Sequence, residues 1–257
     1  MTSIGASERA AALLAPVLPR TRGVAEADLA AVAAPDGTQI FFTRTVPDGW
    51  PADFLPTGHA PGSGPLRVDH VGLTQPFDSF DEAALFYREV LGLGPEAVTE
   101  IPAPYGLIRD RAVTNADHSV RLTATASLLR RGGWAPGVPA PQHVAFGTDD
   151  IVATARALRD AGAPLVAVPA NYHDDLDARF DLDPTRLAAI REFGLFYDEA
   201  GTGAFLHLYT EVLGGRVFFE FVQRIGGYDG YGAANAPVRM AAQRRARLTE
   251  EVAAAGV

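Results

Sequence analysis

The sequence predicts an α+β protein built from two successive βαβββ modules and a C-terminal helix. Two predicted strands each carry a histidine, His70 or His143, and each is followed by a helix that ends at a glycine, Gly92 or Gly162. The two histidines are 73 residues apart, and a single acid, Glu220, lies 77 residues further on in an apolar, β-rich run. Repetition at such a period indicates a duplicated structural unit.

The composition is ordinary for a soluble globular protein, with 47% hydrophobic and 21% charged residues in 257. A net charge of −9 argues against a surface for nucleic acid or anionic membranes. Cysteine is absent, which excludes disulfides and thiolate metal sites and leaves His, Asp or Glu for any metal. We see no secretory signal and no apolar run of about 18 residues, so we expect no membrane span and a cytoplasmic location. The oligomeric state stays open, a homo-oligomer included.

The first 65 residues differ in sequence pattern from the rest. A short helix is predicted, followed by a helical turn or a strand, a turn signal, a β-rich run and a Pro- and Gly-rich linker. These segments are Ser7–Leu18, Ala25–Ala33, Pro35–Gly37, Thr38–Thr43 and Pro47–Pro65. We therefore divide the chain into an N-terminal segment at 1–45, a linker at 46–65 and a main domain at 66–257.

The first module, at about 66–140, opens with a strand at Leu66–Leu73. Asp78 or Ser79 can cap a helix at Phe80–Leu91, whose apolar positions share one broad face. Gly92 and Gly94 end this helix. Three β-rich segments and a Gly/Pro loop follow, at Thr99–Ile101, Leu107–Val113, Ser119–Ala126 and Arg130–Pro141.

The second module, at about 141–225, repeats the pattern. A strand at Pro141–Phe146 precedes a helix at Ile151–Ala161, which Asp149 or Asp150 can cap. A strand, a loop, a helix and two strands are predicted next, at Val166–Val168, Ala170–Phe180, Pro184–Phe193, Ala204–Thr210 and Arg216–Val222. The tail at 226–257 holds a glycine-rich segment and a polar helix at Met240–Ala254.

Glu220 lies between two phenylalanines in a predicted strand. Strand alternation directs Phe218, Glu220 and Val222 to one face. An ionised carboxylate among apolar neighbours is costly unless it is paired or binds a metal. With His70 and His143 it would form a facial triad, which suits Fe(II) and leaves about three coordination positions open. From spacing alone, a pair of hydrogen-bonded core histidines is the alternative.

Three segments resemble the metal-ligand strands of 4-hydroxyphenylpyruvate dioxygenases, which have the vicinal oxygen chelate fold, a glyoxalase-like half-barrel. They are Val68–Val71, Gln142–Ala145 and Phe218–Arg224. The tail Gly226–Asn235 resembles the substrate gate of the same enzymes, and the likeness covers about 66–247. It implies a site for Fe(II), with Mn, Co or another divalent metal as alternatives. It also implies oxidative decarboxylation of a keto acid and hydroxylation of its ring with O2.

Other segments resemble the dioxygenase-like C-terminal half of bacterial two-part 3-dehydroshikimate dehydratases, namely Tyr105–Leu107, Arg111–Val113, Asn171–Phe180 and Tyr231–Asn235. In those proteins a sugar-phosphate-isomerase-like barrel precedes this half and is thought to hold the dehydratase chemistry. We find no such barrel here, and residues 1–45 resemble only the remnant of a preceding βαβββ module. We therefore expect a fragment or a shortened relative.

Two functions follow from these resemblances. The first is a metal-dependent dioxygenase-like enzyme that acts on a keto acid or a related acid of aromatic or shikimate catabolism. The second is the dioxygenase-like module of a 3-dehydroshikimate dehydratase, with a structural or regulatory metal site and no oxygenase activity.

The resemblance also implies a set of substrate-binding residues: Arg111, Thr125, Gln142, His207, Tyr209, Tyr231 and Asn235. Gln142, Tyr231 and Asn235 match the dioxygenases by position. His207 stands where those enzymes have Gln, and Tyr209 where they have Phe. Arg111 falls near a family Ser and Thr125 near a family Asn, and these four departures put 4-hydroxyphenylpyruvate as the substrate in doubt.

Two of these residues have more than one interpretation. Arg111 on an inward strand face would hold a carboxylate of the substrate, and its alternative is an ion pair with an acid at the barrel rim. His207 is predicted to face the barrel, where it would contact substrate or act as an acid or base beside the metal centre. We interpret the acidic Tyr172–Asp175 as a rim loop and helix cap, and His118 as a solvated turn residue.

Overall fold

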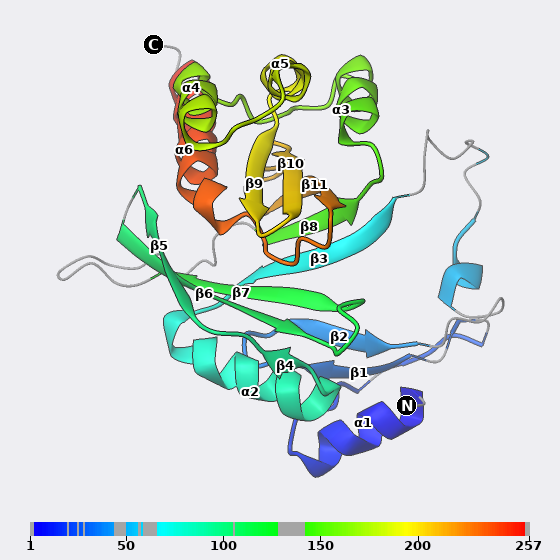
Figure 1. The fold of residues 1–257 in the computed structure, drawn as a ribbon. Coiled ribbons are helices and arrows are strands. Elements are labelled where there is room, and N and C mark those ends of the chain that lie inside the picture. The colour runs from blue at the N-terminus through cyan, green and yellow to red at the C-terminus, as the bar shows by residue number, and fades with distance from the viewer. Residues whose placement is uncertain are drawn as a thin grey trace.

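The computed structural model describes residues 3–19, 21–24, 26–27, 29–43, 50–55, 58, 66–104, 106–127 and 142–254 (Figure 1). The Gly/Pro loop predicted at Arg130–Pro141, Tyr105 and most of the predicted linker lie outside these residues. The prediction of an α+β half-barrel is confirmed, because a curled mixed sheet is covered by helices on its outer faces.

In the described part of the chain nine strands form this sheet, and its centre is the antiparallel pair β3–β8. The first module contributes β3 (Arg67–Thr74), β4 (Gly94–Pro95), β5 (Thr99–Ala103), β6 (Gly106–Thr114) and β7 (Arg121–Ser127). The second contributes β8 (Gln142–Gly147), β9 (Phe196–Ala200), β10 (Gly203–Tyr209) and β11 (Val217–Ile225). The strand order is β4-β6-β7-β3-β8-β11-β10-β9, with β5 on β6. Each central strand has a parallel neighbour from its own module, β7 beside β3 and β11 beside β8. This pairing is the duplication that the sequence predicted.

Helix α2 (Phe80–Leu91) covers the outer face of the first half. It has the predicted bounds, with Ser79 at the N-cap position and Gly92 in the left-handed region (φ 74°) at its end. Val71 and Leu73 of β3 pack against Ala83 and Tyr87 of α2. Because side chains alternate along a strand, His70 and Gly72 face the concave side instead.

The second half is covered by α3 (Ile151–Asp160), α4 (Ala170–Arg179) and α5 (Pro184–Phe193) (Figure 1). The Asp150 side chain caps α3 by accepting a hydrogen bond from the Ala153 backbone N–H. The largest hydrophobic core lies beneath these helices and includes Ile151, Leu176, Ile190 and Phe196. Helix α6 (Ala236–Ala254) follows the 3-10 turn Ala233–Asn235 and crosses back to the first half, where it packs against β5.

The N-terminal segment packs on the outside of α2. It holds α1 (Ser3–Ala12) and the hairpin of β1 (Ala30–Ala33) and β2 (Gln39–Phe42). Ala10 and Val32 form a small cluster with Val90 of α2. The division at 45 and 65 remains a prediction.

Several element predictions were wrong. The first helix ends at Ala12 and not at Leu18, because Leu14 has a positive φ (63°) and Pro16 cannot continue the helix. The predicted loop Ala170–Phe180 is helix α4, whose Tyr172, His173 and Leu176 form a buried face. Val166–Val168 is no strand, β4 and β9 were not predicted, and α6 begins at Ala236.

Candidate metal centre

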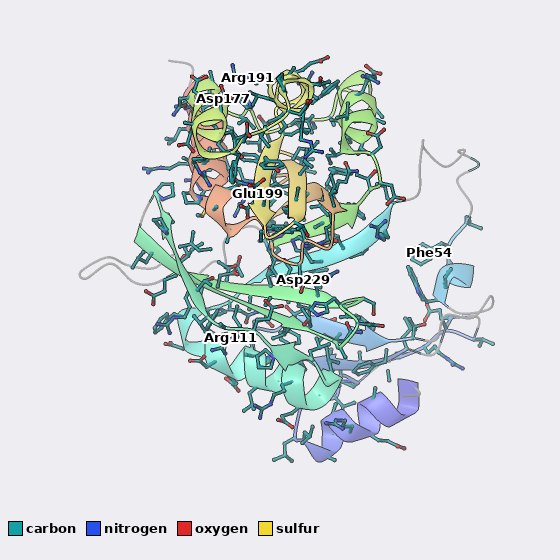
Figure 2. All side chains as sticks on the ribbon, viewed as in Figure 1. Phe54, Arg111, Asp177, Arg191, Glu199 and Asp229 are labelled. Atoms are coloured by element: carbon teal, nitrogen blue, oxygen red, sulfur yellow. The ribbon has the colours of Figure 1, made fainter. Side chains whose placement is uncertain are left out.

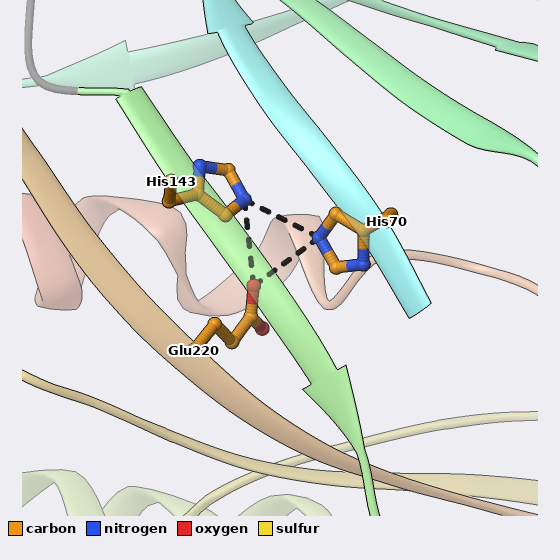
Figure 3. A group of neighbouring side chains, drawn as sticks. All are labelled: His70, His143 and Glu220. Carbon is orange, nitrogen blue, oxygen red and sulfur yellow. Dashed lines mark hydrogen bonds and ion pairs between the residues drawn. The ribbon is translucent and has the colours of Figure 1, made fainter. Parts of the chain in front are cut away.

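Three side chains converge on the concave side of the sheet, one from each of the neighbouring strands β3, β8 and β11 (Figure 3). The Nε2 atoms of His70 and His143 are 3.3 Å apart. Glu220 Oε2 lies 3.2 Å from the first of these nitrogens and 3.5 Å from the second. His70 and Glu220 are almost completely buried, and His143 is partly exposed. The three residues that the sequence suggested are therefore neighbours in space.

The local strand geometry explains this convergence. In β11, Phe218 stacks on the His143 ring and Val222 packs with Ala145, on the same face as Glu220. In β3, the register against β8 shifts between Val68 and His70, which marks a β-bulge. A bulge breaks strict alternation. Asp69 and His70 are consequently both buried, although they are consecutive residues of one strand.

The imidazole of His70 is oriented by a buried ion pair. Its Nδ1 lies 2.8 Å from Asp69 Oδ1, and Arg224 donates two hydrogen bonds to the same carboxylate, at 2.8 and 2.9 Å. Burial alone would raise the pKa of Asp69, but the hydrogen bonds from Arg224 and His70 hold it well below its usual range. The ionised Asp69 therefore keeps a proton on Nδ1 and turns the Nε2 lone pair toward Glu220 and His143.

Glu220 is oriented by a second buried chain. His207 donates from Nδ1 to Glu220 Oε1 at 2.8 Å, and Asn235 donates from Nδ2 to His207 Nε2 at 3.0 Å. The Tyr172 hydroxyl in turn donates to Asn235 Oδ1 at 2.9 Å. Burial opposes ionisation of Glu220, but His70 and His207 keep its pKa well below the usual value. One carboxylate oxygen is thus held by His207, and the other faces the two ligand imidazoles.

The three residues fit a divalent metal. Ligands about 2.1 Å from one ion and at right angles to each other are about 3.0 Å apart, close to the three separations found here. Burial lowers the pKa of His143 to about 3, which keeps its imidazole neutral as a ligand must be. The pKa of His70 is raised despite burial, because Glu220 and Asp69 favour a positive charge there. A bound metal cation would supply that charge in place of a proton.

The structure brings together some of the predicted substrate residues. His207, Tyr209 and Asn235 surround Glu220, and the Tyr209 hydroxyl lies 2.9 Å from His207 Nδ1. His207 is fully buried, so it holds Glu220 and does not line an open surface. The ring of Tyr231 lies edge-on to His70, with 5.3 Å between centroids.

Other predicted substrate residues are placed differently. Arg111 lies beside α2, 3.2 Å from Asp81 and over the Phe80 ring, which supports the ion-pair alternative (Figure 2). By strand alternation, the Gln142 side chain lies on the face of β8 opposite to His143. Thr125, by contrast, does lie on the concave face, directly opposite Asp110 in the β6–β7 pair, and its hydroxyl donates to Asp110 Oδ1 at 2.6 Å.

Sequence reasoning missed several residues that shape the site. Asp69 and Arg224 form the ion pair behind His70, yet neither was assigned a role. Gly72 lies directly opposite His143 in the β3–β8 pair. Arg239 of α6 lies over the rings of Phe218 and Tyr209. The available signals were a charged residue next to a ligand histidine and a glycine within a strand.

Two further candidates proved to have other roles. Tyr172–Asp175 lies within α4 and is not a loop, and Tyr172 supports Asn235. His118 does occupy the turn between β6 and β7, but its imidazole is 3.2 Å from Asp229 of the gate segment and is only partly exposed. Neither belongs to the metal centre.

Comparison with known proteins agrees with this geometry. The family model described as "Glyoxalase/Bleomycin resistance protein/Dioxygenase superfamily" matches residues 67–189. The chain carries a domain of this superfamily. The matched range of the superfamily domain contains the strands of His70 and His143.

Curated relatives of the superfamily domain are enzymes by name. The chain is 37% identical over 235 residues to a 3-dehydroshikimate dehydratase of Pseudomonas putida. The aligned region covers 88% of this chain and 37% of the relative. It is 38% identical over 189 residues to a 4-hydroxyphenylpyruvate dioxygenase of Pseudomonas aeruginosa, covering 67% of this chain and 50% of the relative. The chain thus spans between about a third and a half of the length of these relatives.

Solved structures show the same fold. A xylose isomerase-like TIM barrel/4-hydroxyphenylpyruvate dioxygenase fusion protein superposes with a TM-score of 0.78 at 34% identity, covering 95% of this chain and 40% of that one. A mutant of 4-hydroxymandelate synthase from Streptomyces coelicolor superposes with a TM-score of 0.75 at 22% identity, covering 95% and 74%. Among the described residues of the superfamily domain and its flanks, no helix has the length and apolar character needed to cross a membrane.

Proposed function

We propose that this chain is a metal-dependent enzyme module of the 4-hydroxyphenylpyruvate dioxygenase type, with Fe(II) at His70, His143 and Glu220. Its substrate would be a small keto acid or a related acid of aromatic or shikimate catabolism. The observation that carries the proposal is the convergence of two imidazoles and one carboxylate, all within 4.8 Å of one another. Such a triad occupies one face of the metal and leaves the other face for substrate and oxygen. Mn(II) and Co(II) fit the same donors.

The chain's own residues hold and orient this centre. Asp69 and Arg224 fix the His70 ring, and His207 fixes one oxygen of Glu220. Phe218 and Tyr231 place aromatic rings against the two histidines, of which His70 is almost completely buried. When bound, the metal supplies a Lewis acid for adjacent substrate oxygens and a centre for oxygen activation. The protein thus contributes ligand geometry and a dry surrounding.

Oxygen consumption tests the proposal. Fe(II)-loaded parent protein should consume O2 in the presence of 4-hydroxyphenylpyruvate or a related keto acid, and His143→Ala should not. The metal content of both proteins is measured in the same preparation. A fully loaded parent that consumes no oxygen with 4-hydroxyphenylpyruvate contradicts oxygenase activity toward that substrate.

A second function is favoured by the length of the relatives. The chain covers only 37% of each of two 3-dehydroshikimate dehydratases that it matches, so the similar region is one part of those proteins. In this alternative the metal stabilises or regulates a module that performs no oxygenase chemistry. Fe(II) loading would then raise the midpoint of thermal unfolding, with no oxygen consumption for any keto acid tried. The predicted cytoplasmic location belongs to both proposals.

A further inference from the structure

Arg239 of α6 carries a positive charge next to the metal centre. Its guanidinium carbon lies 5.1 Å from the centroid of the Phe218 ring and 5.3 Å from that of Tyr209. Phe218 stacks on His143, with 4.9 Å between ring centroids. The charge of Arg239 is therefore separated from a ligand imidazole by a single aromatic ring.

Among the residues that the structure describes, most hydrogen-bond donors of Arg239 have no acceptor. Its Nη1 donates to Gln243 Oε1, one turn along the same helix, at 2.8 Å. Within the described part of the chain, no carboxylate lies at ion-pair distance from its guanidinium. An arginine has five N–H donors in a rigid fork that matches a carboxylate. Its contacts with Phe218 and Tyr209 hold the fork in place and leave its edge available.

An acid faces the same region from the other half of the sheet. Asp110 of β6 is partly buried and accepts one hydrogen bond, from the Thr125 hydroxyl of β7 at 2.6 Å. Ile108, two residues earlier in β6, packs against Met240 of α6, the residue that follows Arg239. Strand β6 and helix α6 therefore meet beside both charges.

Asp110 and Arg239 interact without touching. Burial raises the pKa of Asp110, and the Thr125 hydrogen bond and, at longer range, Arg239 and His70 offset only part of this rise. No hydrogen bond or ion pair joins the two side chains in the described structure. A buried carboxylate with a single neutral donor is costly. A hydroxyl group of a bound ligand would supply a further donor to this carboxylate.

We propose that Arg239 and Asp110 select a carboxylic acid that carries hydroxyl groups, with Arg239 binding the carboxylate and Asp110 accepting from a hydroxyl. The inference rests on the proposed function, because it places this acid beside the metal centre. Thr125 positions Asp110 through its hydroxyl. A purely aromatic acid would leave Asp110 without its donor, and sites built to bond a hydroxyl discriminate strongly against analogues that lack it.

Two probes separate the roles of the two residues. Shikimate is a ring acid with hydroxyl groups, and cyclohex-1-ene-1-carboxylate is the same ring acid without them. Titration calorimetry on the metal-loaded protein should show shikimate binding more tightly. Arg239→Met should weaken binding of both probes, and Asp110→Asn should weaken only that of shikimate. A hydrogen bond to a charged group stabilises by about 1.5–3 kcal/mol, so each loss should be roughly 10- to 100-fold.

Arg244→Met is the matched control, since Arg244 is an exposed arginine of the same helix. It should leave both affinities unchanged. Circular dichroism verifies that each variant is folded, and Arg239→Lys serves as a second variant that keeps the charge without the fork. Lys should restore only part of the affinity for either probe.

The outcomes are decisive in both directions. Equal affinity of the parent for the two acids, or no binding of shikimate, overturns the inference. So do unchanged affinities in Arg239→Met. The titrations are repeated on metal-free protein with the same variants. Discrimination between the probes that persists in protein that fails to bind metal supports this inference while the proposed function fails. Normal metal binding and oxygen uptake, with equal affinity for the two probes, supports the proposed function and overturns this inference.

Discussion

Gly72 of β3 lies directly opposite His143 of β8, and a Cβ atom at position 72 would lie 1.8 Å from His143 Cε1. The imidazole thus occupies space that any other residue at 72 would fill. The position of one proposed metal ligand depends on the absence of a side chain on the neighbouring strand.

Gly72→Ala should therefore displace the His143 ring and reduce metal binding well below one equivalent. Elemental analysis after loading and desalting measures this. The control is Gly94→Ala, because a Cβ at Gly94 meets only the Thr114 carbonyl oxygen, at 3.7 Å. Full metal occupancy in Gly72→Ala would show that β3 can move away without disturbing the site.

The assignment of the ligands is tested by removing them. His70→Ala and Glu220→Ala should each abolish stoichiometric Fe(II) binding, since two donors hold a divalent ion far less tightly than three. His118→Ala is the control, because His118 lies in the β6–β7 turn and pairs with Asp229. Full occupancy in either ligand variant would refute the proposed metal centre.

The Asp69–Arg224 ion pair behind His70 should change the metal affinity without supplying a ligand to the metal. Asp69→Asn keeps the size of the side chain but weakens its hold on the Nδ1 proton, and it leaves Arg224 without its charge partner. Loss of such an outer partner typically costs about 10- to 100-fold in metal affinity. Competition with a chelator gives the affinity, and Asp149→Asn, at an exposed acid paired with Arg67, is the control. An unchanged affinity would mean that the bulged strand alone orients His70.

The positioning of Glu220 by His207 can be tested separately from a catalytic role of His207. His207→Gln should retain metal, because an amide can still donate to Glu220. His207→Leu should weaken metal binding about 10- to 100-fold, since Glu220 loses that donor and Asn235 its acceptor. His173→Leu, at a buried histidine of α4 away from the centre, is the comparison. If both His207 variants bind metal like the parent, His207 does not position Glu220.

Asp110 should make the metal-free protein less stable as the pH rises. Burial raises its pKa in the folded state, so folding favours the protonated form. The penalty is absent below the pKa of the unfolded chain, about 3.9, and grows as the pH rises through the folded-state pKa. Asp110→Asn should therefore unfold at a higher temperature than the parent at pH 7, and the difference should shrink toward pH 4. Calorimetry of chelator-treated protein measures the difference in unfolding temperature. A difference that is constant at all pH values would contradict a raised pKa of Asp110 in the folded state.

Much of the fold could be predicted because local signals agreed with the tertiary structure. The terminal glycines of α2 and α5, and the Asp183 side chain that caps α5, mark the bounds of these helices directly. Helix α4 was missed because its surface is rich in Asp, and only Tyr172, His173 and Leu176 mark a buried face. Its buried face is visible only once β9 and β10 are in place beneath it.

The site could be predicted only in part, for a geometric reason. The ligand strands were found through family resemblance, but a strand pattern does not reveal its register. A shift of one residue exchanges the two faces of a strand. Arg111 was therefore expected on the inner face, where Asp110 in fact lies, and the bulge that buries both Asp69 and His70 carries no distinctive residue.

The proposed metal ligands are divided between the two repeats, with His70 on β3 and both His143 and Glu220 on the other side of the β3–β8 pair. Neither repeat alone holds enough donors for a tight site, so a bound ion would act as a cross-link between them. An ion that binds only when the halves are joined stabilises their union by about 4 kcal/mol at a thousandfold excess over its dissociation constant. Metal affinity would then report how well the two halves of a split or permuted chain assemble.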